Sequence, residues 1–306
     1  MTHFFESLFF NPKWYHYIVI VLLLPLSLLY GAILLLKRAL SRAKGYSIPI
    51  VSIGNLIVGG SGKTPFAIAL IEYLTNQGIE QIFYISRGYG RRSKGMVLVK
   101  VKNSIECSVE ESGDEALLVA KSTDASVIVC EDRDSAIVKA KELGAQCIVL
   151  DDAFSKTAIK KYDILLEPAE VKNRFVLPAG PFREFPYVKS YANLMLKEGR
   201  EYKRRVSYEN LTQSMLLVTA IANPQRLEAF LPPNVVGKLY FPDHAYFDRE
   251  QIVDKMRELS VTSLLVTEKD YVKLEQFKLP LSIIKLKLEI DETILKKIKE
   301  EACKQR

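Results

Sequence analysis

The stretch Gly59-Gly60-Ser61-Gly62-Lys63-Thr64 decides the fold, because it joins a short apolar run to an apolar helical pattern. The run over 48–53 predicts a buried strand, and Pro65 with the segment behind it predicts a helix, since proline suits a first helical turn. Glycines let a backbone wrap around phosphates, and a helix N-terminus favours negative charge. Lys63 would reach the outer phosphates, and the hydroxyl of Thr64 would hold Mg²⁺. The stretch therefore predicts a phosphate-binding loop.

The loop departs from the strict form of this motif at one position. Ile57 stands where the strict pattern has its first glycine. A short G-K-T also arises by chance, so a coincidental turn is the alternative at this point. The flanking strand and helix favour the nucleotide loop, and we include Ile57 and Val58 in it.

Composition bounds the class of protein. The chain has 306 residues, of which 48% are hydrophobic and 26% charged, so it is a folded protein of one or two domains. The net charge of +7 points to anionic partners, namely nucleotides, nucleic acid or acidic lipid headgroups. The four cysteines show no C-x-x-C spacing, so neither a disulfide framework nor a zinc site is indicated.

An apolar segment near the N-terminus predicts a membrane anchor. The 23 residues between Lys13 and Lys37 hold no charged side chain, and the 20 residues over 17–36 would span roughly 30 Å as a helix, about the thickness of bilayer hydrocarbon. Aromatic side chains precede the segment and four basic residues follow it, which predicts a cytoplasmic domain behind it. A signal peptide and a buried core helix are the alternatives, and spanning or in-plane insertion stays open.

Strand-like and helix-like runs alternate from residue 46 onward, which predicts an α/β fold. We expect a P-loop NTPase-like, mostly parallel sheet with helices on both faces, a second smaller α/β unit and an N-terminal membrane helix. The predicted strands are 48–53, 81–86, 96–101, 126–130, 147–150, 163–166, 215–221, 235–241, 263–267 and 282–288; the predicted helices are 65–76, 113–122, 133–143, 225–231, 248–259 and the tail from 291. The predicted domains are an anchor with its basic flank (1–45), a P-loop domain (46–186), a linker (187–214) and a C-terminal α/β domain (215–306).

Three acidic or basic motifs could carry chemistry. Asp151 and Asp152 follow a predicted strand, where P-loop enzymes place the carboxylate that holds Mg²⁺, although acidic loop starts are common. Asp114 and Glu115 open a helix, which is ordinary complementation of the helix dipole, but transfer to an alcohol also needs a carboxylate in the cleft. His244 is the only histidine beyond the first 16 residues. It is either the catalytic histidine or an exposed loop residue.

Basic residues supply candidate phosphate contacts. Arg87 and Tyr89 lie just past a predicted strand end, where ligands of α/β sheets bind. Arg133 and Arg183 are further candidates. Each arginine could equally be a solvated surface charge.

The motifs together resemble one family. In order, they are Gly54-Asn55-x-x-x-Gly59-Gly60-Ser61-Gly62-Lys63-Thr64-Pro65, Ser86-Arg87-Gly88-Tyr89-Gly90, Gly113-Asp114-Glu115, Asp151-Asp152-x-Phe154, the run from Leu177 to Glu184, Asn223-Pro224, Asp243-His244 and Thr267-Glu268-Lys269-Asp270. This series, covering about 48–274, resembles the tetraacyldisaccharide 4′-kinases, inner-membrane enzymes that phosphorylate the lipid A precursor with ATP. The loop without a glycine at Ile57 is the form this family uses.

The resemblance implies a reaction and a set of residues. It implies two α/β/α units with ATP in the cleft between them, a two-stranded linker, and γ-phosphoryl transfer to the 4′-hydroxyl of a membrane-embedded tetraacyldisaccharide 1-phosphate, giving lipid IVA. The implied roles are these: residues 57–64 bind the nucleotide; Thr64, Glu115, Asp151 and Asp152 surround Mg²⁺; Asp114 with His244 activates the hydroxyl; and Arg87, Tyr89, Arg133 and Arg183 contact substrate. The implied location is the inner membrane with the catalytic part facing the cytoplasm and an anionic membrane surface; neither a nucleic acid nor an obligate protein partner is expected.

The sequence also departs from the family pattern. Ala116 replaces a common proline, Ser155 and Lys156 replace a Gln-His pair, and 167–176 differs from the usual version. The loop, both candidate acids and His244 are retained, which favours an intact kinase. Another membrane-anchored P-loop ATPase or glycolipid kinase, or a nucleotide-binding membrane module without catalysis, are the rival interpretations.

Overall fold

The computed structural model describes residues 2–304 and has a mixed α/β fold with mostly parallel sheets, as the sequence predicts. Backbone contacts divide the chain into two compact units. The first unit is Met1–Lys63, Leu150–Tyr202 and Asp291–Arg306, and the second is Thr64–Val149 and Lys203–Ile290. The chain passes between the units four times: inside helix α3 (Lys63–Asn76), inside strands β6 (Cys147–Asp151) and β9 (Tyr202–Glu209), and directly after β13 (Leu281–Ile290). The domain boundaries expected from the sequence stay a prediction.

The first unit contains the strand that leads into the phosphate-binding loop. Its strands run in the order β1-β7-β8, all parallel, with Val51 opposite Tyr162 and Ile164 opposite Leu194. The elements are α1 (Thr2–Phe10), α2 (His16–Ala39), β1 (Ile50–Gly54), β7 (Tyr162–Glu167), the 3₁₀ turn η1 (Pro186–Tyr191), β8 (Leu194–Lys197) and α9 (Glu292–Lys304). Strand β1 is buried along its whole length, which fits the apolar run that the sequence shows there.

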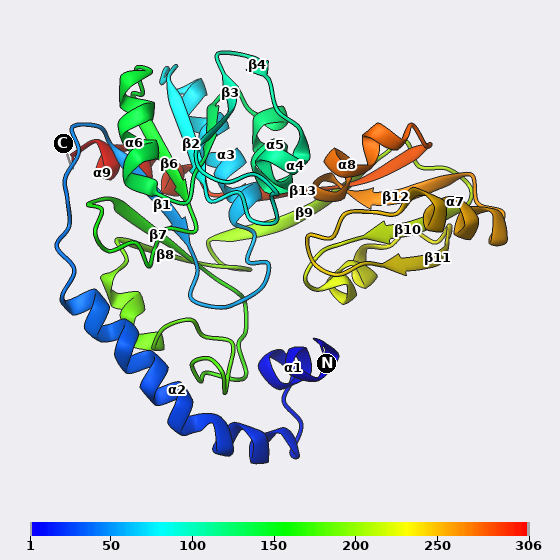
Figure 1. Cartoon of the computed structure of the whole chain (residues 1–306), viewed down its shortest axis with the longest axis horizontal. Coiled ribbons are helices and arrows are strands. Elements are labelled where there is room, and N and C mark those ends of the chain that lie inside the picture. The colour runs from blue at the N-terminus through cyan, green and yellow to red at the C-terminus, as the bar shows by residue number, and fades with distance from the viewer. Residues whose placement is uncertain (1, 305–306) are drawn as a thin grey trace. The chain divides into compact units, whose positions relative to one another are not determined.

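Helix α2, the long blue helix in Figure 1, contains the apolar segment identified in the sequence. With 24 residues, this helix is long and apolar enough to cross a membrane, and only 17% of its most apolar 18-residue stretch is buried. Side chains such as Leu22, which is 72% exposed, therefore argue against a buried core helix. A few small residues dock the helix on its own unit: the Ser27 hydroxyl accepts a hydrogen bond from the Ala179 amide at 2.9 Å, and Gly31 lies against the Phe185 ring.

The second unit begins with a group of neighbouring strands and their helices. The strands follow in the order β4-β3-β5-β2; β2 and β5 are parallel, whereas β3 is antiparallel to both of its neighbours. The elements are α3, β2 (Ile82–Ser86), β3 (Val97–Val101), β4 (Ser104–Ile105), α4 (Val109–Ser112), α5 (Asp114–Ser122), β5 (Ser126–Val129) and α6 (Arg133–Glu142). The first residue of α5 is therefore one of the candidate acids.

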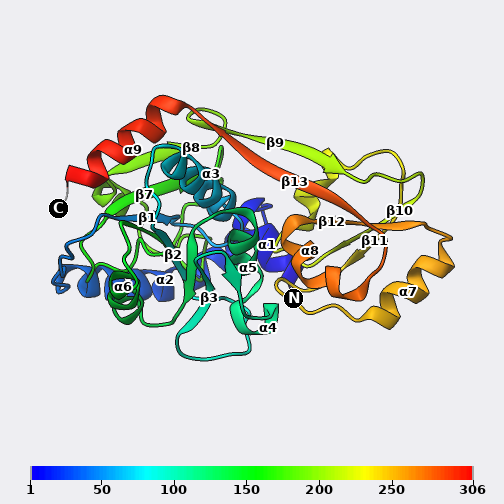
Figure 2. The ribbon, with the colours of Figure 1, turned by 90° about the horizontal axis from the view of Figure 1, so that it is seen from above.

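The second unit ends with a five-stranded sheet in the order β11-β10-β12-β13-β9. The elements are β9 (Tyr202–Glu209), β10 (Met215–Thr219), the 3₁₀ turn η2 (Pro224–Phe230), β11 (Val235–Tyr240), α7 (Arg249–Glu258), β12 (Ser263–Thr267), α8 (Glu268–Leu274), the 3₁₀ turn η3 (Glu275–Phe277) and β13 (Leu281–Ile290). Figure 2 shows β9 and β13 running as long neighbours. Alternate residues of β10 enter separate cores, since Leu216 packs with residues of α7 and α8 and Leu217 packs with residues around η2.

The structure adds elements that the sequence pattern did not predict. These are α1, β4, α4, η1, β8, β9, α8 and η3. The predicted helix over 225–231 is instead a seven-residue 3₁₀ turn, with Pro224 at its start and Pro232 and Pro233 after its end. The remaining predicted strands and helices are present within a few residues of their expected bounds.

Candidate functional site

The loop over 57–64, which is predicted to bind phosphate, is fixed by hydrogen bonds from the buried Asn55 and from Val58. The Asn55 amide donates a hydrogen bond to the Ile57 carbonyl at 2.7 Å, and the amide of Val58 donates to the Pro181 carbonyl at 2.9 Å. Gly59 and Gly62 have φ values of 95° and 82°, a region in which a side chain would be strained. Glycine is therefore required where the backbone turns between β1 and α3.

A cluster of charges lies beside the loop in the first unit. Lys63 donates to Asn55 Oδ1 at 3.3 Å and lies 3.6 Å from Asp152 Oδ1, while Arg183 Nη1 lies 2.7 Å from Asp152 Oδ2. Burial by itself would raise the pKa of Asp152, but the charges of Lys63 and Arg183 outweigh it and lower that pKa. The Asp152 carboxylate is therefore ionised between two cations.

Asp152 is fixed by its backbone as well. Its φ is 47°, which is uncommon for a residue other than glycine, and its amide donates to the Ile53 carbonyl of β1 at 2.9 Å. Asp151, the last residue of β6, is buried directly before it. The structure thus places Lys63, Asp152 and Arg183 together, with Asp151 next in sequence.

The donor atoms of this region suit Mg²⁺. Among residues 2–304 no group of three or more His, Cys, Asp or Glu side chains is arranged to hold a metal. Mg²⁺ typically binds proteins through one or two carboxylates and takes its other ligands from water and phosphates. An ionised Asp152 with Asp151 beside it provides hard oxygen donors of that kind. Thr64 and Glu115 belong to the second unit, and their place in a metal site stays a prediction.

A cavity of about 290 Å³ in the first unit connects these charges with the apolar helix. Tyr30 and Leu34 of α2 line it, together with Asp152, Phe154 and Arg183. The same cavity therefore offers apolar surface from the membrane-length helix and ionised groups from the loops. An amphipathic ligand with a polar head would match this lining.

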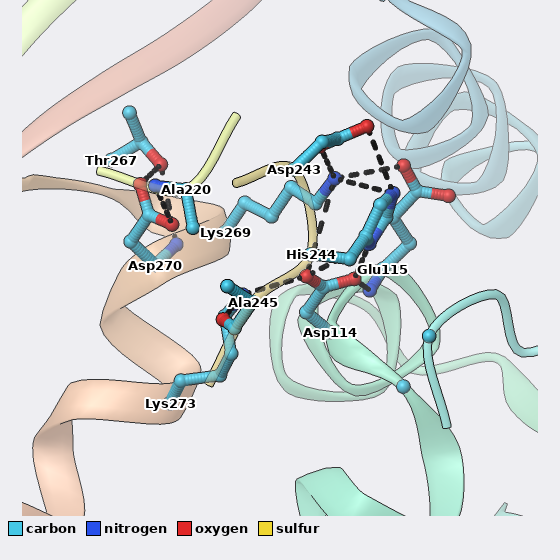
Figure 3. Close-up of polar contacts among 12 residues, drawn as sticks. Asp114, Glu115, Ala220, Asp243, His244, Ala245, Thr267, Lys269, Asp270 and Lys273 are labelled. Atoms are coloured by element: carbon cyan, nitrogen blue, oxygen red, sulfur yellow. Dashed lines mark hydrogen bonds and ion pairs between the residues drawn. The ribbon is translucent and has the colours of Figure 1, made fainter. Parts of the chain in front are cut away.

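Asp114 and His244 form the centre of a second charged cluster, inside the second unit (Figure 3). His244 Nδ1 lies 3.0 Å from Asp114 Oδ1 and 3.1 Å from Oδ2. The two residues are separated by 130 positions in the chain, and the Asp114 side chain is only 3% exposed. The backbone amide of Glu115 also donates to Asp114 Oδ1 at 2.9 Å.

Two lysines of helix α8 complete this cluster. Lys273 Nζ, in a side chain that is 2% exposed, lies 3.0 Å from Asp114 Oδ2 and donates to the Ala245 carbonyl at 3.1 Å. Lys269 Nζ lies 3.1 Å from His244 Nε2 and 4.0 Å from Asp114 Oδ2. Burial would raise the pKa of Asp114, but the bond to His244 and the charges of both lysines hold that pKa well below its usual range. Asp114 is therefore a buried carboxylate kept ionised by neighbouring cations.

The loop that carries His244 is fixed to the sheet behind it. The His244 amide donates to the Ala220 carbonyl at 3.0 Å, with the residue at a φ of 60°. Asp270, fully buried on α8, accepts hydrogen bonds from the Thr219 hydroxyl at 2.6 Å, the Thr267 hydroxyl at 2.7 Å and the Ala220 amide at 3.1 Å. These bonds tie β10, the histidine loop and α8 together, so His244 and the lysines are held in one arrangement.

The glycine-rich segment that follows β2 in the sequence packs against the Asp114–His244 pair. The Tyr89 ring meets the His244 ring edge-on with centroids 4.7 Å apart. A Cβ atom added at Gly90 would lie 3.0 Å from His244 Cβ, and one added at Gly113 would lie 2.9 Å from the Tyr89 carbonyl oxygen. Glycine at these two positions allows the close approach that brings Tyr89 next to His244.

The other predicted substrate contacts have different surroundings. Arg87 is exposed, and Tyr89 is 67% exposed although one edge touches His244. Arg133 is buried at the start of α6, where its guanidinium donates to the Cys130 carbonyl. Arg183 belongs to the Asp152 cluster of the first unit. The structure therefore brings Tyr89 to the Asp114–His244 pair and Arg183 to Lys63.

Sequence reasoning did not assign roles to Lys269 and Lys273. Lys269 lies inside Thr267-Glu268-Lys269-Asp270, one of the ordered motifs, and Lys273 follows it by four positions. Residues four apart share one face of a helix, so this spacing was the available signal. The pattern alone does not show which acid that face would meet.

Comparison with known proteins gives consistent matches over nearly the whole chain. The family model for tetraacyldisaccharide-1-P 4′-kinase matches residues 19–215 and 198–303. The tetraacyldisaccharide 4′-kinase of Helicobacter pylori strain HPAG1 is 46% identical over 299 residues, covering 96% of this chain and 93% of that protein. The Aliarcobacter butzleri enzyme of the same name is 44% identical over 298 residues, covering 94% and 93%. The crystal structure of LpxK from Aquifex aeolicus in complex with ATP superposes with a TM-score of 0.77 at 26% identity, covering 93% of this chain and 99% of that one.

Proposed function

This chain belongs to the tetraacyldisaccharide-1-P 4′-kinase family, and we propose that it transfers the γ-phosphoryl group of ATP to the 4′-hydroxyl of a tetraacyldisaccharide 1-phosphate, giving lipid IVA in lipid A biosynthesis. The observation that carries this assignment to particular residues is the buried, ionised Asp114 in contact with His244. Transfer to an alcohol needs a group that orients the hydroxyl and accepts its proton. Asp114 with His244 is assigned that task.

The nucleotide is assigned to the loop over 57–64. Lys63 would contact the outer phosphates, and backbone amides at the start of α3 would face the anionic groups. Thr64, Asp151 and Asp152, with Glu115, are the proposed Mg²⁺ ligands. Mg²⁺, when bound, would neutralise charge on the transferred phosphoryl group. The ion pairs of Asp152 with Lys63 and Arg183 support this assignment, because they keep a carboxylate ionised next to the loop.

The acceptor is assigned to Arg87, Tyr89 and Arg183, and Arg133, which is buried with its guanidinium on the Cys130 carbonyl, would act only from behind this surface. Support for a lipid acceptor comes from the cavity in which Tyr30 and Leu34 of α2 lie with Asp152 and Arg183. Acyl chains favour the apolar lining, whereas a phosphorylated sugar favours the arginine. Phosphoryl transfer further requires that the nucleotide loop and the Asp114–His244 pair act on the same acceptor.

The proposed location is the bacterial inner membrane with the catalytic units facing the cytoplasm. Helix α2 is long enough to anchor the chain, and Lys37, Arg38, Arg42 and Lys44 at and after its C-terminal end favour the cytoplasmic side and an anionic leaflet. An anchor would confine the enzyme to the surface that holds its lipid substrate.

A direct assay tests the proposed function. Full-length protein in detergent is incubated with radiolabelled ATP, Mg²⁺ and tetraacyldisaccharide 1-phosphate, and the labelled lipid is separated. We expect a singly labelled product that disappears when a chelator removes Mg²⁺ and returns when Mg²⁺ is added back. Nucleotide hydrolysis without response to the disaccharide would identify a different P-loop enzyme. Nucleotide binding without hydrolysis or transfer would identify a non-catalytic module.

A further inference from the structure

The Lys269 ammonium group contacts Nε2 of His244, the ring nitrogen that does not contact Asp114. Its Nζ lies 3.1 Å from His244 Nε2, while His244 Nδ1 lies 3.0 Å from Asp114 Oδ1 (Figure 3). The imidazole ring is thus placed between a carboxylate on one side and an ammonium group on the other. The His244 side chain is 11% exposed, so these two neighbours and not bulk water decide where its proton is.

The chemistry of the two partners determines the protonation of the ring. A lysine ammonium group has three donors and no acceptor, so Nε2 must present its lone pair to Lys269. The ring proton is then on Nδ1, from which it is donated to the ionised Asp114. A neutral imidazole with Nδ1–H is the state that satisfies both contacts at once.

If Lys269 were absent, the other charged groups around the His244 ring would favour the protonated imidazolium ion. Asp243 Oδ2 lies 3.7 Å from His244 Nε2, on the same side as the lysine. Lys269 Nζ also lies 3.5 Å from Glu115 Oε1 and 3.7 Å from Asp243 Oδ1, so together with Asp114 three carboxylates surround it. Lys273 contacts Asp114 and donates a hydrogen bond to the Ala245 carbonyl. The Tyr89 ring packs edge-on against the His244 ring.

Removal of the Lys269 charge would leave His244 between Asp114 and Asp243. Both nitrogens would then face a carboxylate, and an imidazolium ion would satisfy both of them. An imidazolium accepts no proton, and it would hold the Asp114 carboxylate in a tight ion pair. Either effect would make the pair a poorer base toward an alcohol.

We propose that Lys269 is a positioning residue that holds His244 as the neutral imidazole with its proton on Nδ1. This role rests on the proposed function only in assigning the Asp114–His244 pair to the acceptor hydroxyl. It acts through His244, whose Nε2 its Nζ contacts at 3.1 Å.

Nitrogen NMR on the full-length protein reads the protonation directly. The chain has three histidines, and the signals of His244 are assigned by their loss in His244→Gln. With ¹⁵N-histidine label at near-neutral pH, we expect the wild-type protein to show a protonated Nδ1 and an unprotonated Nε2. We expect Lys269→Met to show a protonated Nε2, and Lys269→Arg, which keeps a donor and its charge, to restore the wild-type pattern. Lys255→Met, the same change at a partly exposed position on α7, should leave the pattern unaltered.

Kinetics supply the second measurement. We expect Lys269→Met to lower kcat by about tenfold or more with KM for ATP and for the disaccharide nearly unchanged, and Lys269→Arg to recover most of kcat, as for partners that orient a catalytic group. A protonated Nε2 in the wild-type protein would overturn the proposal without any variant, and so would an unchanged His244 pattern in Lys269→Met. The expected NMR pattern in a protein that phosphorylates no disaccharide would refute the proposed function and leave the Lys269 role supported.

Discussion

The two charged clusters of this protein are built on different principles. The cluster of Lys63, Asp152 and Arg183 has side chains that are 14%, 37% and 37% exposed, and loops carry two of its three members. The cluster of Asp114, Lys273, His244 and Lys269 has side chains that are 3%, 2%, 11% and 18% exposed, and two helices and a fixed loop carry it. Both clusters keep a carboxylate ionised between cations.

The difference in burial indicates what each cluster is built to do. Charges near water lose little when a partner is removed and can exchange that partner for a ligand. Buried charges lose much when a partner is removed, because no water replaces it. This difference supports the proposed roles, in which the loop cluster accepts phosphates and a metal ion and the buried cluster holds one geometry through the reaction. The following experiments are ordered by the size of the expected effect.

Substitution of the buried acid should have the largest effect on turnover. For Asp114→Ala we expect kcat for disaccharide phosphorylation to fall by about 10²–10⁴-fold, the range for loss of a general acid–base group. Steady-state kinetics with radiolabelled ATP measures this. Circular dichroism and thermal unfolding of the same sample show whether the protein is folded. Turnover within about threefold of wild type in a folded sample would contradict the assigned role.

Removal of a buried cation should have the largest effect on stability. Lys273→Met breaks a pair whose atoms are 3.0 Å apart and leaves Asp114 without its closest ammonium group. We expect the free energy of unfolding to fall by about 3 kcal/mol, since breaking a buried ion pair strands the other charge. Denaturant titration measures the change. Lys255→Met on α7 is the matched control, for which we expect a change within about 0.5 kcal/mol; equal effects of the two variants would contradict the difference between buried and exposed lysines.

Acid should weaken the buried cluster in a predictable direction. The pKa of Asp114 is lower in the folded than in the unfolded chain, where it is near its ordinary value of about 3.9. The ionised form therefore contributes stability that is fully present above that value and is lost as the pH falls through the lower, folded pKa. Thermal unfolding of wild type and Asp114→Asn should show a gap in Tm at neutral pH that narrows below about pH 4. A gap that widens on acidification would reverse this sign.

Substitution in the loop cluster should have the smallest effect on stability. Arg183 and Asp152 are each about a third exposed, so Arg183→Met should lower the free energy of unfolding by about 1 kcal/mol or less. We expect its effect to fall instead on binding, as a raised KM for the acceptor or for ATP. A loss of stability as large as that of Lys273→Met would show that the two clusters are equivalent after all.

Local sequence patterns were sufficient for most of the elements. The loop between β1 and α3, the helix starting at Asp114 and the buried β10 follow from apolar periodicity, glycine and proline positions, and helix-terminal charges. These signals are local, because each one can be recognised within a few neighbouring residues of the sequence. The extent of α2 was equally clear, since its 24 residues carry no break in apolar character until Lys37.

The elements that the sequence pattern did not reveal depend on long-range pairing. Strand β8 has four residues and is defined by its parallel partner β7, and α8 has seven residues directly behind a strand. Short segments carry too few residues for a period to be recognised. The segment of η2 is a different case, since a helix was predicted there and the structure has a 3₁₀ turn.

The candidate site divides in the same way. The sequence by itself determined which residues are chemically able to act: the glycines and Lys63 of the loop, the carboxylates at 114, 151 and 152, and a single histidine beyond the anchor. Residue type and spacing carry that information because they fix what a side chain can donate, accept or charge.

Only the tertiary structure decided which of these residues meet. It brings His244 into contact with Asp114, from which it is separated by 130 positions in the chain. Lys269 and Lys273 join this pair from a helix that the sequence pattern did not predict. Asp152 instead contacts Lys63 and Arg183. Burial then turned ordinary side chains into a fixed ion cluster, because charges excluded from water interact strongly with whichever partners the fold supplies. The sequence contains the reactive groups, and the fold selects their partners and protonation.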